Sequence, residues 1–442
     1  MKVVGLVTEY NPFHNGHKYH IEEAKRVAGA DYTVAVMSGN FVQRGTPAVI
    51  DKYSRAEMAL KNGVDLVLEL PVCYATGSAE FFAHGAISLL DKLGIVDYLC
   101  FGSECGDIEL IQTAAEFLNN TPDSFENILS SSLKKGLTYP AARLKALEHS
   151  LSQSDNSKRS QDILKLLAEP NNILGIEYVK AISNLSSSMI PITITRKAAH
   201  YHEKGLSEQK EPTADFQMTV PDDDMAFGDI TISSATAIRN VIQGIGNTSN
   251  LSRAKHSVPS DVYEFFNANY QKTFPITIED FSQIIKYKLL SEDNQSLTHY
   301  VDITRDLADR MMNIIDYNVS ITELTKNIKT KNMTLTRINR ALIHLLLNIQ
   351  SDNFREYNRN GYSPYARVLG IKKESSHLLR KIIKNGKIPV ITKVSKASEQ
   401  LDALGMKMLS EDLFATHLYN QAIYEKYQAS ITNEFKHGIC IV

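Results

Sequence analysis

A chain of 442 residues is too long for a single compact core, so two or three domains are predicted. A hydrophobic fraction of 43% and a charged fraction of 22% are ordinary for globular proteins, and no apolar run is long enough for a membrane span. The net charge of −2 conceals an asymmetry, because residues 326–396 hold 16 Lys or Arg against 3 Asp or Glu, as expected for a polyanion-binding segment.

Strands and helices alternate over the first 110 residues. Apolar runs predict strands at 3–7, 32–37, 64–70 and 96–101. Helices are predicted between them at 17–27 and 78–93, and a further helix is predicted to begin at Ser54, where Ser54 and Glu57 form a capping-box pattern. This order is typical of right-handed βαβ units and predicts a parallel sheet.

Predicted helices and a further strand continue as far as residue 250. Helices are predicted at 107–118, 139–150 and 172–185, a fifth strand at 189–195, and a further helix from Ser234. Residues 152–161 are polar and predict an exposed loop, while residues 204–224 are charged, without clear periodicity, and predict a mobile loop.

Helical apolar spacing dominates beyond residue 250. Helices are predicted at 262–269, 281–290, 307–315, 321–329 and 335–349, followed by a short strand at 388–392. The predicted fold is therefore α/β: a Rossmann-like domain with a parallel sheet over residues 1–250, and a mainly α-helical, basic region over residues 251–442.

The loop after the first strand is the most informative segment. It opens a helix, so its backbone N–H groups and the helix dipole favour a phosphate at the carboxyl edge of the sheet. Gly16 removes a side chain there, and His14 and His17 share one helical face, from which imidazoles can donate to phosphate oxygens. Neither a P-loop nor a GxGxxG fingerprint is present. Helix capping or metal binding is the alternative for two such histidines.

NPFHNGH resembles the HxGH signature of the cytidylyltransferase-like nucleotidyltransferases. More closely, VTEYNPFHNGHKYH, VMSGNFVQRGTPA, VDLVLELP, FGSE, PNNILGIEYVKA and SSATAIR resemble the bacterial tRNA(Met) cytidine acetate ligases, over nearly the whole chain. The resemblance implies that acetate attacks ATP to give acetyl-adenylate and pyrophosphate. The acetyl group then passes to the wobble cytidine of elongator tRNA(Met), giving N4-acetylcytidine. The implied ligands are ATP, Mg²⁺, acetate and tRNA. The expected location is the cytoplasm, and neither a membrane nor a protein partner is implied.

The resemblance also assigns site residues. His14, His17 and Arg239 are the expected catalytic residues. The expected ATP-binding residues are Val7, Thr8, Glu9, Tyr10, Asn11, Pro12, Phe13, His14, Asn15, Gly16, His17, Lys18, Tyr19, His20, Gly102, Asn171, Arg196, Ser234 and Thr236. Read alone, Gly102 could be a turn glycine, Asn171 a helix cap and Arg196 a surface cation. Ala235 departs from the ISSTxIR element of the wider superfamily, and capping is the alternative role for Ser234.

Within the basic segment, Lys329, Lys331, Arg337, Arg340 and Arg367 are the expected tRNA-binding residues. Cations can track phosphates, and the interleaved aromatics could stack on unpaired bases; they are Phe354, Tyr357, Tyr362 and Tyr365. A solvated helical face is the alternative.

Three smaller features complete the sequence-based expectations. Arg44 follows the second strand, and we hypothesise that it meets acetate or pyrophosphate. Residues 393–398 resemble the KMSKS loop only superficially, and a solvated basic strand end is favoured there. The four cysteines lack CxxC or zinc spacing, which indicates reduced structural thiols.

Two other functions fit parts of the sequence. One is a small-molecule adenylyltransferase, although such chains are usually shorter and need no basic helical half. The other is a non-catalytic, nucleotide-sensing RNA-binding protein, against which the intact His14, Gly16 and His17 argue. The sequence identifies no acetate pocket, metal ligand, proton acceptor for the cytidine amine, or oligomeric state.

Overall fold

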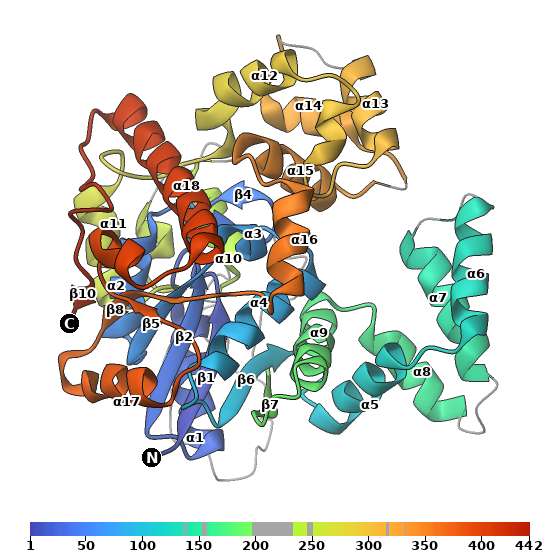
Figure 1. The fold of residues 1–442 in the computed structure, drawn as a ribbon, viewed down its shortest axis with the longest axis horizontal. Helices are drawn as coiled ribbons and strands as arrows, with labels where there is room; N and C mark the ends of the chain where they lie inside the picture. The colour runs from blue at the N-terminus through green and yellow to red at the C-terminus, as the bar shows by residue number, and fades with distance from the viewer. Residues whose placement is uncertain are drawn as a thin grey trace, which may run out of the picture.

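The computed structural model describes residues 1–135, 137, 139–152, 157–196, 233–244, 251–314, 318–331 and 333–442. Within these residues, eight strands form one central sheet (Figure 1). They are β1 Val3–Thr8, β2 Tyr32–Ser38, β5 Leu66–Leu70, β6 Tyr98–Ser103, β7 Ile190–Thr195, β8 Ala366–Ile371, β9 Val390–Ile391 and β10 Cys440–Ile441. The sheet order is β10-β8-β5-β2-β1-β6-β7, with β9 beside β8, and a separate hairpin joins β3 Phe41–Val42 to β4 Thr46–Pro47.

The five strands predicted from the N-terminal part are all present, and they are parallel. β1 pairs with β2 and β6, β2 pairs with β5, and β6 pairs with β7. The chain moves from β1 to β2 and β5 on one side, and then crosses to β6 and β7 on the other. In open α/β sheets, such a reversal creates a crevice at the carboxyl ends of the strands, where ligands bind.

Alternate residues of the strands face two different hydrophobic cores. In β2, Val34 and Val36 enter one core, while Ala35 and Met37 enter the other. The first core receives side chains from α4 Ala79–Lys92 and α9 Pro170–Asn184, and the second from α1 Asn15–Ala28, α2 Lys52–Lys61, α10 Ala235–Ile242 and α11 Ser260–Asn269. Helices thus cover both faces, which confirms the predicted α/β class.

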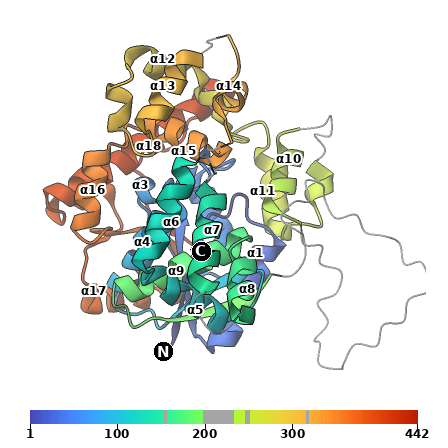
Figure 2. The same cartoon turned by 90° about the vertical axis from the view of Figure 1, so that its right-hand side faces the viewer.

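Four helices between β6 and α9 form a lateral extension. They are α5 Ile108–Asn119, α6 Asp123–Lys134, α7 Tyr139–Ser152 and α8 Ser157–Leu166. Of these, α6 and α7 stand away from the body (Figure 1), and all four helices face the viewer in Figure 2. The polar loop predicted at 152–161 is wrong in its second half, because α8 begins at Ser157. The loop predicted at 204–224 lies outside the described residues.

The start of α2 also differs from the prediction. Its N-cap is Asp51, whose Oδ1 accepts from the backbone N–H groups of Tyr53 and Ser54, both at 3.0 Å. An aspartate at this position satisfies the orphan donors of the first turn, so the helix starts before the predicted Ser54 cap.

The second half of the chain is mainly helical, as predicted. Beyond α10 and α11 it contains α12 Ser282–Ser291, α13 Arg305–Ile314, α14 Ile321–Ile328, α15 Leu335–Leu346, α16 Ser351–Arg359, α17 His377–Asn385 and α18 Ala403–Tyr427. A short α3 Val72–Ala75 precedes α4, and 3₁₀ turns occur at Leu251–Ala254, Ile278–Phe281, Ser296–His299, Lys373–Ser375 and Val394–Glu399. None of the helices in the described part of the chain combines the length and apolarity of a bilayer span.

The predicted division at residue 250 does not separate the sheet from the helical half. β8 pairs with β5 in antiparallel register, with Leu66 opposite Ile371, and β9 and β10 extend the sheet from β8. In α18, the Tyr419 hydroxyl donates to the carbonyl of Ala48 at 2.7 Å. The C-terminal half is therefore built into the same sheet and core as the N-terminal half.

Candidate active site

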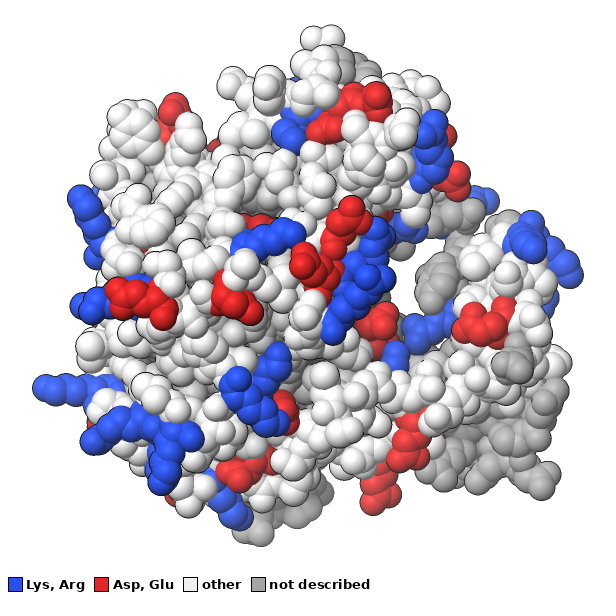
Figure 3. Space-filling view, in the orientation of Figure 1, with Lys and Arg blue, Asp and Glu red and all other residues white. Residues whose placement is uncertain are grey.

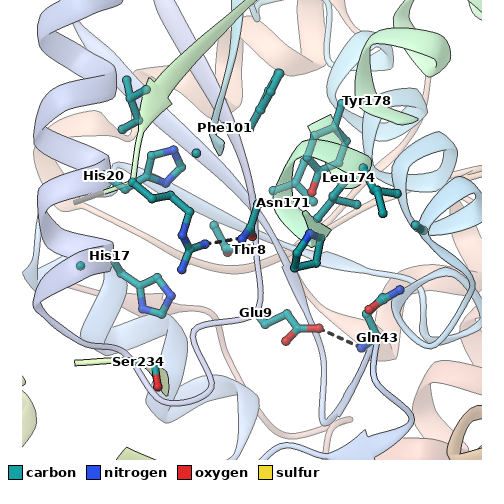
Figure 4. A pocket seen from close by; sticks show the side chains of 18 of the residues that line it. Thr8, Glu9, His17, His20, Gln43, Phe101, Asn171, Leu174, Tyr178 and Ser234 are labelled. Carbon is teal, nitrogen blue, oxygen red and sulfur yellow. Dashed lines mark hydrogen bonds between the residues drawn. The ribbon is translucent and has the colours of Figure 1, made fainter. Parts of the chain in front are cut away.

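A cavity of about 460 Å³ lies at the carboxyl ends of β1, β6 and β7, at the point where the strand order reverses (Figure 4). Its walls come from the β1–α1 loop, the β3–β4 hairpin, the first turn of α9 and the start of α10. Ala79 and Phe82 of α4 and Thr336 in the first turn of α15 also line the cavity. The C-terminal half thus reaches the site through one helix end.

The predicted ATP-binding loop contributes to the cavity only in part. Eight of its members line the cavity: Val7, Thr8, Glu9, His14, Gly16, His17, Tyr19 and His20. The other six members do not line it: Tyr10, Asn11, Pro12, Phe13, Asn15 and Lys18. The prediction treated the segment as uniform, whereas the loop alternates between cavity-facing and anchoring residues.

Most of the residues that do not face the cavity fix the loop in place. Tyr10 and Phe13 are fully buried, with ring centroids 4.9 Å apart. Asn11 Oδ1 accepts from the N–H of Val49 at 2.9 Å, and Asn15 Nδ2 donates to the carbonyl of His256 at 2.9 Å. These contacts hold the loop against the second core, so its functional side chains are presented from a rigid base.

Arg55 in α2 is a second support that the sequence did not reveal. Its side chain is fully buried and donates to the carbonyl oxygens of Glu9 (2.6 Å), Ser38 (3.0 Å) and Ile50 (2.9 Å), and to that of Gly39. The carbonyl of Glu9 follows β1, and those of Ser38 and Gly39 lie at and just after the end of β2, so one guanidinium ties together two adjacent strand ends. Its planar fork of donors suits this role.

The two histidines of the HxGH motif sit at the start of α1. His14 is the N-cap, and its backbone N–H donates to His17 Nδ1 at 3.3 Å. The two rings stack with centroids 3.7 Å apart, and Tyr10 meets the His17 ring edge-on at 4.9 Å. His14 Nδ1 is buried and has no hydrogen-bond partner within the described chain. A buried, unsatisfied ring nitrogen at a cavity wall fits a hydrogen bond to a ligand.

Burial and nearby cations keep the imidazoles neutral. Burial lowers the pKa of His14 to about 3, with further lowering by the charges of Arg196 and Arg239. Burial likewise lowers the pKa of His20 to about 4 and that of His17 well below its usual value. A neutral imidazole carries one N–H donor. The motif is therefore prepared to donate hydrogen bonds to an anion before any proton is taken up.

The opposite wall joins the end of β6 to the start of α9. The Glu104 carboxylate accepts from the backbone N–H of Asn172 at 2.9 Å and from Asn171 Nδ2 at 2.5 Å, and Asn172 Oδ1 accepts from the N–H of Glu104 at 2.9 Å. Asn171 therefore lies inside the first turn and is not the helix cap, which is Glu169. Glu104 belongs to the FGSE motif, but its role as a clamp required the fold.

Arg196 is positioned by this clamp. One of its guanidinium nitrogens donates to Asn171 Oδ1 at 2.9 Å. A Cβ on Gly102 would lie 3.2 Å from Arg196 Cγ, so glycine leaves room for that side chain. Gly102, Asn171 and Arg196 all line the cavity, which brings together three residues predicted from separate motifs.

The α10 motif contributes unequally. Ser234 lines the cavity and caps α10, accepting from the N–H of Ala237 at 3.1 Å. Thr236 and Arg239 are not among the lining residues; instead Arg239 donates to Thr236 Oγ1 at 2.8 Å and to the carbonyl of Asn11 at 2.7 Å. Arg239 thus binds the HxGH loop through the carbonyl of Asn11, outside the cavity lining, and adds positive charge close to the loop. Its catalytic role stays a prediction.

The five predicted tRNA-binding cations differ in exposure, and one of them is buried. Lys329 and Lys331 are exposed, Arg337 is half-buried, and Arg340 Nε donates to Asp302 Oδ2 at 2.7 Å. Arg367 is 3% exposed and forms ion pairs with Glu69 (3.3 Å) and Glu434, so its assignment to tRNA is wrong. Arg367 lies in β8 inside the sheet, and a buried cation is stable there only when it is paired with buried carboxylates.

The aromatic residues of the basic segment behave similarly. Phe354, Tyr357 and Tyr365 are buried in the first core, and only Tyr362 of the four is partly exposed. Base stacking by the three buried rings is therefore excluded. No residue of 393–398 lines the cavity, so the KMSKS-like sequence takes no part in it.

Basic side chains nevertheless border a hollow in the molecular surface. Figure 3 shows this hollow between the body and the α6–α7 arm, with Lys and Arg on both sides. On the arm, Lys134, Lys135 and Lys145 are exposed. Among the described residues no cluster of His, Cys, Asp or Glu is arranged to hold a metal ion, and all four cysteines are unpaired.

Comparison with known proteins identifies the family. A profile described as HIGH Nucleotidyl Transferase matches residues 1–214 and 219–434. The tRNA(Met) cytidine acetate ligase of Alkaliphilus metalliredigens is 39% identical over 96% of this chain and 95% of its own. That of Acetivibrio thermocellus is 36% identical over the full length of both chains. The chain belongs to the tRNA(Met) cytidine acetate ligase family.

Solved structures agree with this membership. The crystal structure of Thermotoga maritima TmcAL bound with alpha-thio ATP matches with a TM-score of 0.84 and 31% identity, over the whole of both chains. The apo form of the same protein matches with a TM-score of 0.86. The acetate ligase family fold therefore extends across both halves of this chain, including the C-terminal strands.

Proposed function

We propose that this chain is an ATP-dependent ligase that acetylates the wobble cytidine of elongator tRNA(Met). Acetate attacks the α-phosphorus of ATP, giving acetyl-adenylate and pyrophosphate. The N4 amine of the cytidine then takes the acetyl group, giving N4-acetylcytidine and AMP. The observation that carries the proposal is the cavity at the strand reversal, lined by the HxGH histidines, in a chain 39% identical to a ligase of that name.

The donors around the cavity support a triphosphate near the start of α1. His14, His17 and Ser234 lie at helix starts, where N–H donors and the positive end of the helix dipole favour phosphate. As negative charge develops on the leaving pyrophosphate, fixed donors stabilise it. Gly102 and Asn171 line the wall proposed for the nucleoside. Mg²⁺ is proposed to enter with the nucleotide, held by phosphate oxygens and water.

The position of α15 supports an RNA substrate. Thr336 lines the cavity, and the same helix carries Arg337 and Arg340. Lys329 and Lys331 lie on the segment that leads into this helix. We propose that these four cations contact phosphates of the anticodon arm, which places the wobble base beside the cavity, in the cytoplasm where tRNA functions. Arg44 also lines the cavity, and its contact with acetate or pyrophosphate stays a proposal.

Pyrophosphate exchange into ATP tests the first step. Labelled pyrophosphate should enter ATP only when acetate is present, and His14→Ala should reduce the exchange by about 100-fold or more. A small-molecule adenylyltransferase would exchange without acetate when given its own substrate, and a nucleotide sensor would not exchange at all. Exchange independent of acetate, or none with the wild-type protein, would overturn the proposed function.

A further inference from the structure

Glu9 is the one carboxylate that lines the cavity among the described residues. It directly follows β1, and Arg55 holds its backbone carbonyl at 2.6 Å. Its side chain makes a single hydrogen bond in this part of the chain, in which the backbone N–H of Gln43 donates to Oε1 at 2.9 Å (Figure 4). The carboxylate is thus held by one oxygen, and the other is available to a substrate.

A negative charge at this position is unsuited to direct contact with a triphosphate. Two anions at contact distance repel, and repulsion is strong in a partly enclosed site. The donors proposed for the phosphates are instead His14, His17 and Ser234, which line the cavity at the starts of α1 and α10. Glu9 hydrogen bonds to the β3–β4 hairpin, a different wall.

The β3–β4 hairpin leads to the proposed RNA side. Gln43 and Arg44 line the cavity, and the next residue, Gly45, approaches α15 so closely that a Cβ there would lie 2.2 Å from Arg340 N. Thr336, one turn earlier on α15, also lines the cavity. Glu9 therefore contacts the hairpin that packs on the helix proposed to carry the RNA.

We propose that Glu9 is the proton acceptor for the cytidine amine in the second step, an assignment that rests on the proposed function. The N4 nitrogen forms a bond to the acetyl carbonyl carbon, and the bond from that carbon to the phosphate oxygen of AMP breaks. The amine loses one proton, which passes to the free oxygen of Glu9 and then to solvent. No oxidant, reductant or further reactant is needed.

The other titratable groups of the cavity are less suited to accept this proton. Burial and adjacent cations lower the pKa of His14 to about 3 and of His20 to about 4, and lower that of His17 well below its usual value. Arg44 and Arg196 are cations. Burial raises the pKa of Tyr178, with a contribution from the charge of Glu9, so its hydroxyl stays protonated. A positioned carboxylate can act as a general base.

The experiment compares the two half-reactions in Glu9→Gln. Glutamine keeps an oxygen that can accept from Gln43 N–H but cannot take up a proton. Acetate-dependent pyrophosphate exchange reports step one, and single-turnover transfer of labelled acetate to tRNA reports step two. Transfer should fall by about 100-fold more than exchange, the lower range for loss of a general base. The residual transfer should rise with pH as hydroxide replaces the carboxylate, and Glu9→Asp should restore part of it.

Glu104→Gln is the matched control, because this carboxylate fixes the cavity wall without lining it. It should change exchange and transfer by the same factor. Equal losses in both steps for a folded Glu9→Gln, as expected of a magnesium ligand, would overturn the assignment, as would unchanged transfer. If Glu9→Gln unfolds, Glu9→Asp decides: transfer must fall more than exchange. Absent exchange in the wild-type protein would instead refute the proposed function itself.

Discussion

The imidazole rings of His14 and His17 lie nearly parallel, with an interplanar angle of 22° and centroids 3.7 Å apart. A proton on either ring would place its charge against the other, and this repulsion adds to burial in lowering the pKa of His17. The pair therefore holds two neutral donors side by side at the start of α1. Phosphate oxygens can accept from both without a prior protonation step.

Replacing either ring should impair the adenylation step. His14→Ala and His17→Ala each remove one donor aimed at the developing charge, so acetate-dependent pyrophosphate exchange should fall by about 100-fold or more. Glu22→Gln is the control, because Glu22 is exposed on the same helix and does not line the cavity. A loss below about tenfold in both alanine variants would remove these rings from the charge-stabilising role.

The buried imidazoles also predict how stability depends on pH. His14 has a pKa of about 3 when folded and an ordinary value near 6.5 when unfolded. Below pH 6.5 the unfolded chain binds a proton that the folded chain does not, so stability is full above pH 6.5 and declines as pH falls toward 3. Each such histidine contributes at most about 1.4 kcal/mol per pH unit.

A double difference isolates this effect. Urea unfolding of wild type and His14→Asn at about pH 7 and about pH 5 gives four free energies, and wild type should lose more stability than the variant between the two pH values. The comparison cancels the titration of groups common to both proteins. Equal losses in the two proteins would show that His14 titrates normally in the folded state.

The N-terminal strands and the position of the HxGH loop at the cavity were predictable because their signals are local. A continuous apolar run such as 3–7 and an HxGH loop at its end lie within 20 residues of each other, so periodicity and motif suffice. The parallel order and the cavity then follow from the connection rules for such units. The burial of Tyr10 and Phe13 was not predicted, because a sequence motif does not show which of its side chains point into the core.

The role of β8 was not predictable, because it depends on partners far away in sequence. Arg367 reads as a surface cation in a basic segment, yet Glu69 and Glu434 meet it in the interior. Lys52 joins the same group, 2.9 Å from Glu69 and 3.2 Å from Glu434. A count of charges along the chain cannot distinguish a solvated cation from one paired across a sheet.

The contact between Gly45 and α15 predicts a strong effect of a single methyl group. Gly45 has φ +71°, and an added Cβ would lie 2.2 Å from Arg340 N and 2.5 Å from the carbonyl carbon of Asn339. Because both neighbours are backbone atoms, Gly45→Ala must move the hairpin away from α15. We expect a loss of about 1–3 kcal/mol in the free energy of unfolding, measured in urea.

Gly29→Ala provides the matched comparison. Gly29 has φ +55°, but nothing lies within 4 Å of an added Cβ, so only the backbone strain of a left-handed residue remains. Its loss should be about 1 kcal/mol. Equal losses in the two variants would mean that the approach of the hairpin to α15 is looser than the structure indicates. Gly45→Ala should also raise the KM for tRNA, since Gln43 and Arg44 would shift.

The exposed cations before α15 predict a change in the salt dependence of tRNA binding. Lys329→Ala and Lys331→Ala should each weaken binding and lower the slope of log affinity against log salt by about 0.7–0.9 if each contacts one phosphate. Pyrophosphate exchange should be unaffected, because neither side chain lines the cavity. Lys61→Ala, outside the basic segment, should leave the slope unchanged. A slope that stays constant in both variants would place the RNA elsewhere.

Arg55 predicts a linked loss of stability and nucleotide binding. Its guanidinium satisfies four backbone carbonyls, of which that of Glu9 lies directly after β1 and that of Ser38 belongs to the last residue of β2. Arg55→Leu would leave these oxygens buried without donors, at a cost of about 1–3 kcal/mol for each one that water cannot reach. We therefore expect a loss of at least about 3 kcal/mol in urea unfolding.

Arg55→Lys separates the charge from the geometry. Lysine keeps the positive charge but cannot reach four carbonyls from one planar group, so it should recover only part of the stability. The KM for ATP should rise in both variants, because the carbonyl of Glu9 is the point at which Arg55 holds the loop. Arg26→Lys is a suitable control, since Arg26 is exposed and pairs with Glu23 on the surface of α1. If Arg55→Lys matched wild type in both measurements, a single bonded carbonyl would suffice, and the brace across the two strand ends would not be required.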